Sequence, residues 1–154
     1  MCNLYNNNFV KTKENITDDD IKEIEKMYKF DFPEEIRRHY LTYNGGEPEK
    51  YVFIDDDGDE YIVQKFISIE KKGSNDLKTT LDRLRVSDSI LPDWLIPIAV
   101  DPGGNMYCFS LMKKELGSIY FWNHEYEYGE NQEDNIIYLA DSLKEFIESL
   151  VEDY

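Results

Sequence analysis

The stretch from Trp94 to Glu125, WLIPIAVDPGGNMYCFSLMKKELGSIYFWNHE, predicts three short strands joined by two turns. The first strand, 95–100, is nearly all apolar and holds three β-branched residues. The turn at 101–105, DPGGN, combines a proline that fixes φ with glycines that allow positive φ. Strands at 106–111 and 118–122 follow, and 113–117 carries the chain between them. Strands of this kind form a meander, whose aromatic surface must be covered on at least one face.

Both faces of the predicted meander are apolar. Alternation places Tyr107 and Phe109 on one face and Met106 and Cys108 on the other, and the same holds along 119–122. Either both faces are covered, or one forms a partly open groove, and the pattern leaves both alternatives open. An open aromatic groove edged by acids would be a protein-binding surface.

Amphipathic helices flank the meander and carry apolar stripes that can cover it. They are expected to begin after Thr17, at Pro33, at Asp76 and after Ser142, which with Glu145 forms a capping box. The second helix is expected to end at 44–46, Asn-Gly-Gly, with glycine in the left-handed C-terminal position.

The rest of the chain adds further strands to what its length marks as a single domain over 1–154. Residues 1–15 are polar and Asn-rich, and we expect a frayed arm or a short edge strand there. The segments 51–54 and 61–69 are expected to be strands around an acidic hairpin turn at 55–60, and 136–140 to be another.

The net charge is the most informative property of the composition. Thirty-three acidic against seventeen basic residues give −16. Such a surface repels phosphate backbones and anionic lipid, which disfavours binding to nucleic acid or membranes. It favours basic protein partners, which long-range attraction steers to the surface.

The sequence features also bear on compartment and order. A hydrophobic content of 41% with 14% aromatic residues excludes a disordered protein. No apolar run reaches the length of a membrane span and no signal peptide is visible. Cys2 and Cys108 are not expected to form a disulfide, and we expect a cytoplasmic protein, either a monomer or a weak homodimer.

The acidic run at 55–60 resembles a calcium-binding loop, but its spacing does not fit. With Gly58 at the invariant sixth position of an EF-hand loop, position one is Phe53 and position twelve is Gln64. Two required ligands are missing. We therefore expect a solvated hairpin tip, with weak cation binding as the alternative, and no metal or cofactor.

An enzyme is the least favoured of the function classes. It would use His124 with Cys108 or Asp101, yet a cysteine inside a strand is usually a small core residue, and His39 is expected on a helix surface. The sequence contains no GxSxG, HExxH, CxxC or glycine-rich phosphate loop. We therefore expect a binding protein, not an enzyme.

The loop 123–135 is rich in acids, contains no lysine or arginine, and interleaves two tyrosines with the acids. It suits recognition of a basic protein surface, or it is an ordinary solvated loop. Together with the other acidic turns it gives the candidate partner-binding residues, which are Glu47, Asp55, Asp56, Asp57, Asp59, Asp101, Glu125, Tyr126, Glu127 and Tyr128.

Several pieces of the sequence, in order over roughly 17–150, resemble the SUKH superfamily. That superfamily groups bacterial toxin-immunity proteins with a fungal cell-wall-synthesis regulator. The pieces are FPEE at 32–35 with YLTYNGG at 40–46; LIPIA at 95–99 with Asp101, Gly104-Asn105 and Tyr107; IYFWNHE at 119–125; and YLADS at 138–142 with Phe146. Asn123 departs from the commoner aspartate, and Phe32 conservatively replaces a leucine.

The resemblance implies an α+β fold, with a single mostly antiparallel sheet and helices packed against it. It also implies a non-enzymatic role: bacterial members are typically antidotes that bind a toxin, often a nuclease. The leading hypothesis is therefore an immunity protein that neutralises a cognate toxin, with a nuclease domain as the expected partner. The alternative is a regulatory scaffold that binds endogenous proteins, as the fungal relatives suggest.

Overall fold

The computed structural model describes residues 4–70, 76–87, 91–123 and 136–152. In chain order, the elements are β1 (Phe9–Val10), α1 (Asp18–Tyr28), α2 (Glu34–Thr42), β2 (Glu47–Pro48), β3 (Val52–Ile54), β4 (Glu60–Ile62), β5 (Lys65–Phe66), α3 (Leu77–Leu81), the π-helical turn η1 (Asp82–Ser87), β6 (Leu95–Val100), β7 (Met106–Ser110), the 3-10 turn η2 (Lys113–Glu115), β8 (Ile119–Trp122), β9 (Ile136–Ala140) and α4 (Leu143–Glu148). In the described parts of the chain, no helix has the length and apolarity that a membrane span needs.

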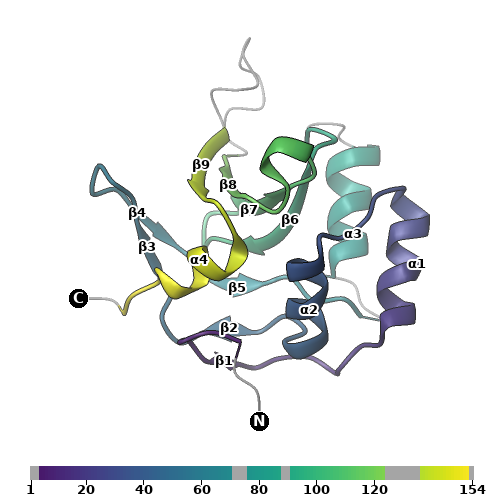
Figure 1. Cartoon of the computed structure of the whole chain (residues 1–154), viewed down its shortest axis with the longest axis horizontal. Coiled ribbons are helices and arrows are strands. Elements are labelled where there is room, and N and C mark those ends of the chain that lie inside the picture. Colours follow the sequence, from purple (N-terminus) through teal and green to yellow (C-terminus); the bar gives the residue numbers. More distant parts are fainter. Residues whose placement is uncertain (1–3, 71–75, 88–90, 124–135, 153–154) are drawn as a thin grey trace.

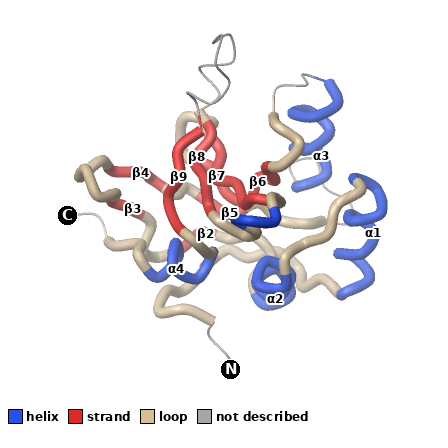
Figure 2. The backbone as a smooth tube through the Cα atoms, turned by 45° about the horizontal axis from the view of Figure 1, so that its top comes forward, coloured by secondary structure: helices blue, strands red, loops and turns tan. Residues whose placement is uncertain are grey.

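The main sheet is antiparallel throughout, with strand order β5-β6-β7-β8-β9. The predicted meander is confirmed as its three central strands, and a bulge at Ile98 shifts the register between β6 and β7. The β1–β2 and β3–β4 pairs form separate two-stranded sheets. Helix α4 packs against β9 and α2, and α3 packs against β6 (Figures 1 and 2). The fold is therefore α+β, as expected.

Both faces of the central strands are covered, which decides between the two alternatives that the sequence left open. Every described residue of β7 and β8 is buried. On one face, the ring of Tyr107 lies 5.5 Å from that of Phe146 in α4, and Phe109 lies 5.9 Å from Phe32. On the other, Trp94 meets Tyr120 edge-on at 5.2 Å.

The segment 61–69 is not one strand, contrary to the prediction. Val63 donates its N–H to Tyr51 C=O within the β3–β4 hairpin, whereas the N–H of Gln64 donates to Val100 C=O of β6. The chain therefore changes sheets between these two residues. Apolar periodicity continues across the change, so it gives no sign that the hydrogen-bonding partner differs.

Side-chain caps begin helices α1 and α4, and one of the bonds at the start of α4 comes from α2. Thr17 caps α1 with a reciprocal capping box in which Asp20 is the partner. In α4, the hydroxyl oxygen of Ser142 accepts from the N–H of Glu145 at 3.1 Å, as expected. The N–H of Leu143 donates across to the carboxylate of Glu35 at 2.6 Å. A charged acceptor of this kind fixes the start of α4 to α2.

The amino-terminal segment forms the expected short strand, and Tyr5 and Asn7, among the described residues before it, are buried. β1 pairs with β2, and the buried Asn7 exchanges two hydrogen bonds with the backbone of Lys50. Tyr5 is also buried, and its hydroxyl lies 3.0 Å from His39 Nδ1. This segment therefore covers one side of α2.

His39 is buried, contrary to the prediction of a surface position. Its imidazole is 1% exposed and packs against the rings of Phe9 and Phe66, at 5.6 and 5.2 Å. Burial lowers the pKa of His39 to about 3. The pattern of α2 alone could not show this, because the covering residues come from distant parts of the chain.

Helix α2 ends at Thr42, directly before the Asn-Gly-Gly sequence, but no glycine caps it in the left-handed conformation as predicted, and the sequence instead holds three segments together. The C-cap residue is the extended Tyr43. The side-chain amide of the buried Asn44 donates to Glu14 C=O at 2.7 Å and Ile69 C=O at 2.8 Å, and its oxygen accepts from Ile69 N–H at 2.7 Å. A Cβ at Gly46, where φ is +94°, would lie 2.8 Å from Val10 O. The glycine therefore allows this close approach.

Replacement of this asparagine tests its structural role. Asn44→Ala removes three hydrogen bonds and leaves backbone groups of Ile69 without their partner, so we expect a loss of about 2–4 kcal/mol in the free energy of unfolding. Asn8→Ala is the control, because Asn8 is exposed and bonds only Glu49 through its side chain; we expect less than about 0.5 kcal/mol. Urea unfolding measures both, and equal losses would contradict the assignment.

Burial of His39 predicts a specific pH dependence of stability. Between pH 6.5 and about 3, the unfolded chain binds a proton at this imidazole and the folded chain does not. The contribution of neutral His39 to the free energy of unfolding is therefore complete above pH 6.5. It decreases as the pH is lowered through this window, by up to about 1.4 kcal/mol per pH unit. The unfolding free energy of the wild type minus that of His39→Phe should therefore fall as the pH is lowered from 6.5 toward 3. A difference independent of pH would refute the prediction.

Candidate functional site

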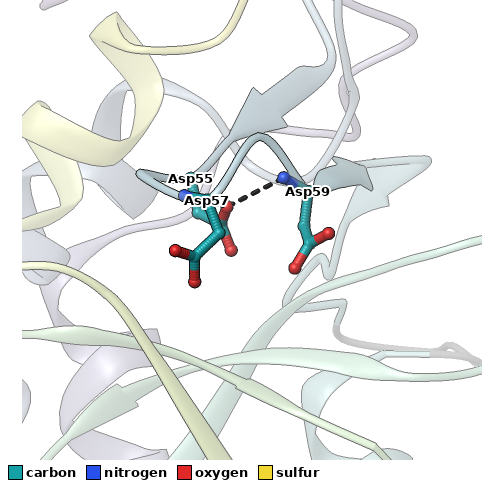
Figure 3. Close-up of side chains that lie close together, drawn as sticks. All are labelled: Asp55, Asp57 and Asp59. Carbon is teal, nitrogen blue, oxygen red and sulfur yellow. Dashed lines mark hydrogen bonds between the residues drawn. The ribbon is translucent and has the colours of Figure 1, made fainter.

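Among the predicted binding residues that the structure describes, the most exposed group is the acidic tip of the β3–β4 hairpin (Figures 1 and 3). One carboxylate builds the turn: Oδ1 of Asp55 accepts from the N–H groups of Asp57 and Asp59, both at 2.9 Å. The N–H of Gly58, where φ is +85°, donates to Asp55 C=O at 3.0 Å. Asp55 is half-buried and holds the backbone that presents the other acids.

The remaining acids of the tip point into solvent. The side chains of Asp56, Asp57 and Asp59 are exposed, and carboxylate oxygens of Asp55, Asp57 and Asp59 lie within 4.8 Å of one another (Figure 3). Weak cation binding by these three carboxylates stays a prediction. The chemical property of the tip is therefore concentrated negative charge.

Asp101 builds the β6–β7 turn by the same device as Asp55. Its Oδ1 accepts from the N–H groups of Gly103 and Asn105 at 2.9 and 2.7 Å, and Oδ2 accepts from the Asn105 amide at 3.0 Å. Both aspartates therefore bond the backbone two and four residues ahead. These two predicted binding residues have structural roles that occupy their carboxylates.

The other predicted residues fall into two groups. Glu47 is half-buried in β2, and its carboxylate lies 3.6 Å from Lys11 Nζ. Glu47 and Asp101 line the same groove, separate from the hairpin tip. Glu125, Tyr126, Glu127 and Tyr128 lie outside the described residues, so their role stays a prediction.

That groove is a feature that the sequence did not reveal. It has a volume of about 730 Å³, and Lys11, Lys13, Lys65 and Arg83 line it alongside the carboxylates of Glu47, Glu70 and Asp101. Its cations come from three separated segments, which are the amino-terminal arm, β5 and η1. No local pattern could have predicted that they meet.

The residues considered for catalysis do not form a reactive site among the described residues. Cys108 is fully buried inside β7, and His39 is enclosed by aromatic rings. Neither lines the groove, whereas Asp101, the other residue considered, does line it and uses its carboxylate to bond the backbone of its own turn. His124 lies outside the described residues. The expectation that the chain is not an enzyme stays a prediction.

The free energy of unfolding can distinguish the hairpin acid that builds the turn from an acid that only adds surface charge. Asp55→Ala removes two charge-assisted hydrogen bonds and should lower the free energy of unfolding by about 1–2 kcal/mol. Asp56→Ala, at the neighbouring exposed position, should change it by less than about 0.5 kcal/mol. Thermal unfolding of the pair checks this, and a loss at Asp56 as large as that at Asp55 would contradict the assignment.

Comparison with known proteins places the chain in a family. A family model described as the SMI1 / KNR4 family (SUKH-1) matches residues 15–149. A search of curated proteins found no match. The matched range contains α1 through α4, the whole main sheet, the acidic hairpin and the Asn44 region. The chain therefore belongs to the SMI1 / KNR4 family (SUKH-1).

Proposed function

We propose that this chain is an immunity protein that binds and neutralises a cognate bacterial toxin, a nuclease domain, in the cytoplasm of the producing cell. The observation that carries the proposal is a net charge of −16 on a family member whose exposed acids stand on a projecting hairpin. The role is one of protein binding and needs no cofactor.

The charge of a nuclease supplies the physical reason. A nuclease must hold phosphates, so its active site carries positive charge. A strongly acidic protein can cover such a site because it offers a negative field similar to that of nucleic acid. The same field raises the association rate, and close ion pairs add affinity when they are desolvated.

The candidate contact residues differ in exposure and in whether their carboxylates already accept hydrogen bonds. Asp56, Asp57 and Asp59 are exposed, and their carboxylates accept no hydrogen bond that would have to be broken on binding, as far as the described residues go. Asp55 and Asp101 instead act by shaping their turns. Glu47 forms an ion pair with Lys11, so we expect it to contribute little to binding of a basic partner.

The alternative is a regulatory scaffold that binds endogenous proteins. The family that the chain matches is described by the name SMI1 / KNR4, and that description favours neither role over the other. The two roles differ in genomic context and in rescue. A toxin gene next to this one, whose product arrests growth unless this protein is co-expressed, supports the immunity role. Failure to bind or silence the product of any neighbouring toxin gene would refute it.

Charge reversal at the hairpin tests where the partner is recognised. Asp57→Lys should slow association with the neighbouring toxin domain by about three- to tenfold at low salt and flatten its salt dependence. Glu23→Lys on α1 is the matched control, because Glu23 is also exposed and its reversal changes the net charge equally. Stopped-flow association rates provide the measurement. Equal slowing by both variants would remove the hairpin from the interface.

The same reversal at Glu125 and Glu127 tests the loop that lies outside the described residues. Unchanged association rates there would remove that loop from the candidate contacts.

A further inference from the structure

The outer edge of β9 is an exposed, uncharged strand edge. β9 pairs with β8 on one side, and no strand in the described part of the chain pairs with its other side. Its sequence, IIYLA, contains no charged residue, proline or glycine. Ile137 is 39% exposed and Tyr138 is 48% exposed, and alternation places them on opposite faces of the sheet.

The opposite edge of the sheet is protected in ways that β9 is not. β5 is only two residues long, and the N–H of Phe66 donates to Gly46 C=O at 2.7 Å. Proteins usually blunt edge strands with short length, charges, proline or a covering segment, since an open edge pairs with other chains. Among the described residues, β9 has a register shift near its carboxyl end, between the partners of Ile119 and Tyr120, but has none of these other devices. Its outer backbone groups are thus a template for another strand.

The charged residues around β9 indicate which charge a strand added to its outer edge should carry. Tyr61 of the acidic hairpin packs on Phe121 at 5.1 Å, and Phe121 pairs with Ile137 in β9. On the other face, the Tyr138 hydroxyl donates to Asp141, and the neighbouring Tyr120 donates to Glu115. On this face Glu115 and Asp141 therefore lie near the edge together with Lys113 and Lys114, which line the same pocket as Tyr138. On the face of Ile137 the nearby charge is that of the hairpin, where Asp55 accepts from the Tyr61 hydroxyl. A second copy of the chain would bring another −16 to this place, so a basic strand fits better.

We infer that the outer edge of β9 accepts an extended, basic segment of a protein partner as a sixth strand of the main sheet. Backbone hydrogen bonds along the edge supply affinity, and Ile137 and Tyr138 supply apolar contacts on the two faces. The identity of that partner as a toxin rests on the proposed function. The capacity of the β9 edge to pair with a basic strand does not rest on the proposed function.

A synthetic peptide tests the edge directly. The probe is an acetylated and amidated octapeptide of alternating lysine and valine, titrated into the ¹⁵N-labelled full chain. We expect shifts and slowed hydrogen exchange of the amides of 136–140. Ile137→Lys, which places a cation beside the incoming strand, should weaken binding about tenfold. Val10→Lys, at an exposed apolar position of strand β1, should leave it unchanged.

A second probe keeps the test valid if Ile137→Lys does not fold. A peptide of the same sequence with every backbone nitrogen methylated keeps its charge but has no backbone donor on either edge, so its binding to the wild type should be lost. The inference is overturned by unchanged amides at 136–140, by shifts confined to 55–60, or by equal binding of both peptides. Concentration-dependent protection of 136–140 with a dimer mass, without peptide, would also overturn it, because the occupant would then be a second copy.

The neighbouring toxin domain separates this inference from the proposed function. Neutralisation of the toxin by a chain whose amides at 136–140 respond neither to the peptide nor to the toxin would overturn the edge and leave the immunity role. Peptide binding at β9, with no binding or silencing of the toxin, would overturn the immunity role and leave the edge.

Discussion

Burial of both faces of the central strands is the constraint on which the rest of this fold depends. Every described residue of β7 and β8 is buried, so the sheet requires cover from both sides. Phe146 of α4 and Phe32 before α2 cover one face, and Trp94 packs on the other. Groups such as the Cys108 thiol are thereby removed from solvent. The elements at the rim of the sheet, which are its turns, the β3–β4 hairpin and the edge of β9, are therefore where we propose that a partner is recognised.

At that rim, single aspartates both shape the backbone and contribute charge. Asp55 and Asp101 each bond two N–H groups ahead in the chain, and in doing so fix a turn. Asp56, Asp57 and Asp59 are then held in solvent on a fixed backbone. A rigid display of charge limits the entropy lost on binding, which would favour the partner binding that we propose. The acidic surface is thus partly a consequence of how the turns are built.

The sequence predicts local structure well where one element decides it. The bounds of β6 and β9, the caps at Thr17 and Ser142, and the acidic hairpin turn all follow from short patterns. It fails where a distant segment decides. The break between Val63 and Gln64 depends on β6, and the burial of His39 depends on the arm that holds Tyr5.

The candidate site shows the same division. The exposed acids were found because charge in a turn is visible in the sequence. The structural roles of Asp55 and Asp101 need the turn geometry, and the groove lined by Lys11, Lys65 and Arg83 needs the tertiary fold. The exposed edge of β9 depends on strand order, which a strand's own sequence does not contain.

The central claim is that a negative surface on an unreactive scaffold captures a positively charged protein. Titration calorimetry of the purified chain with the toxin domain encoded beside it, at low and at high salt, tests this claim most directly. The account predicts a one-to-one complex whose affinity falls steeply as salt rises. An absence of binding at low salt, or an affinity that salt does not change, would contradict it.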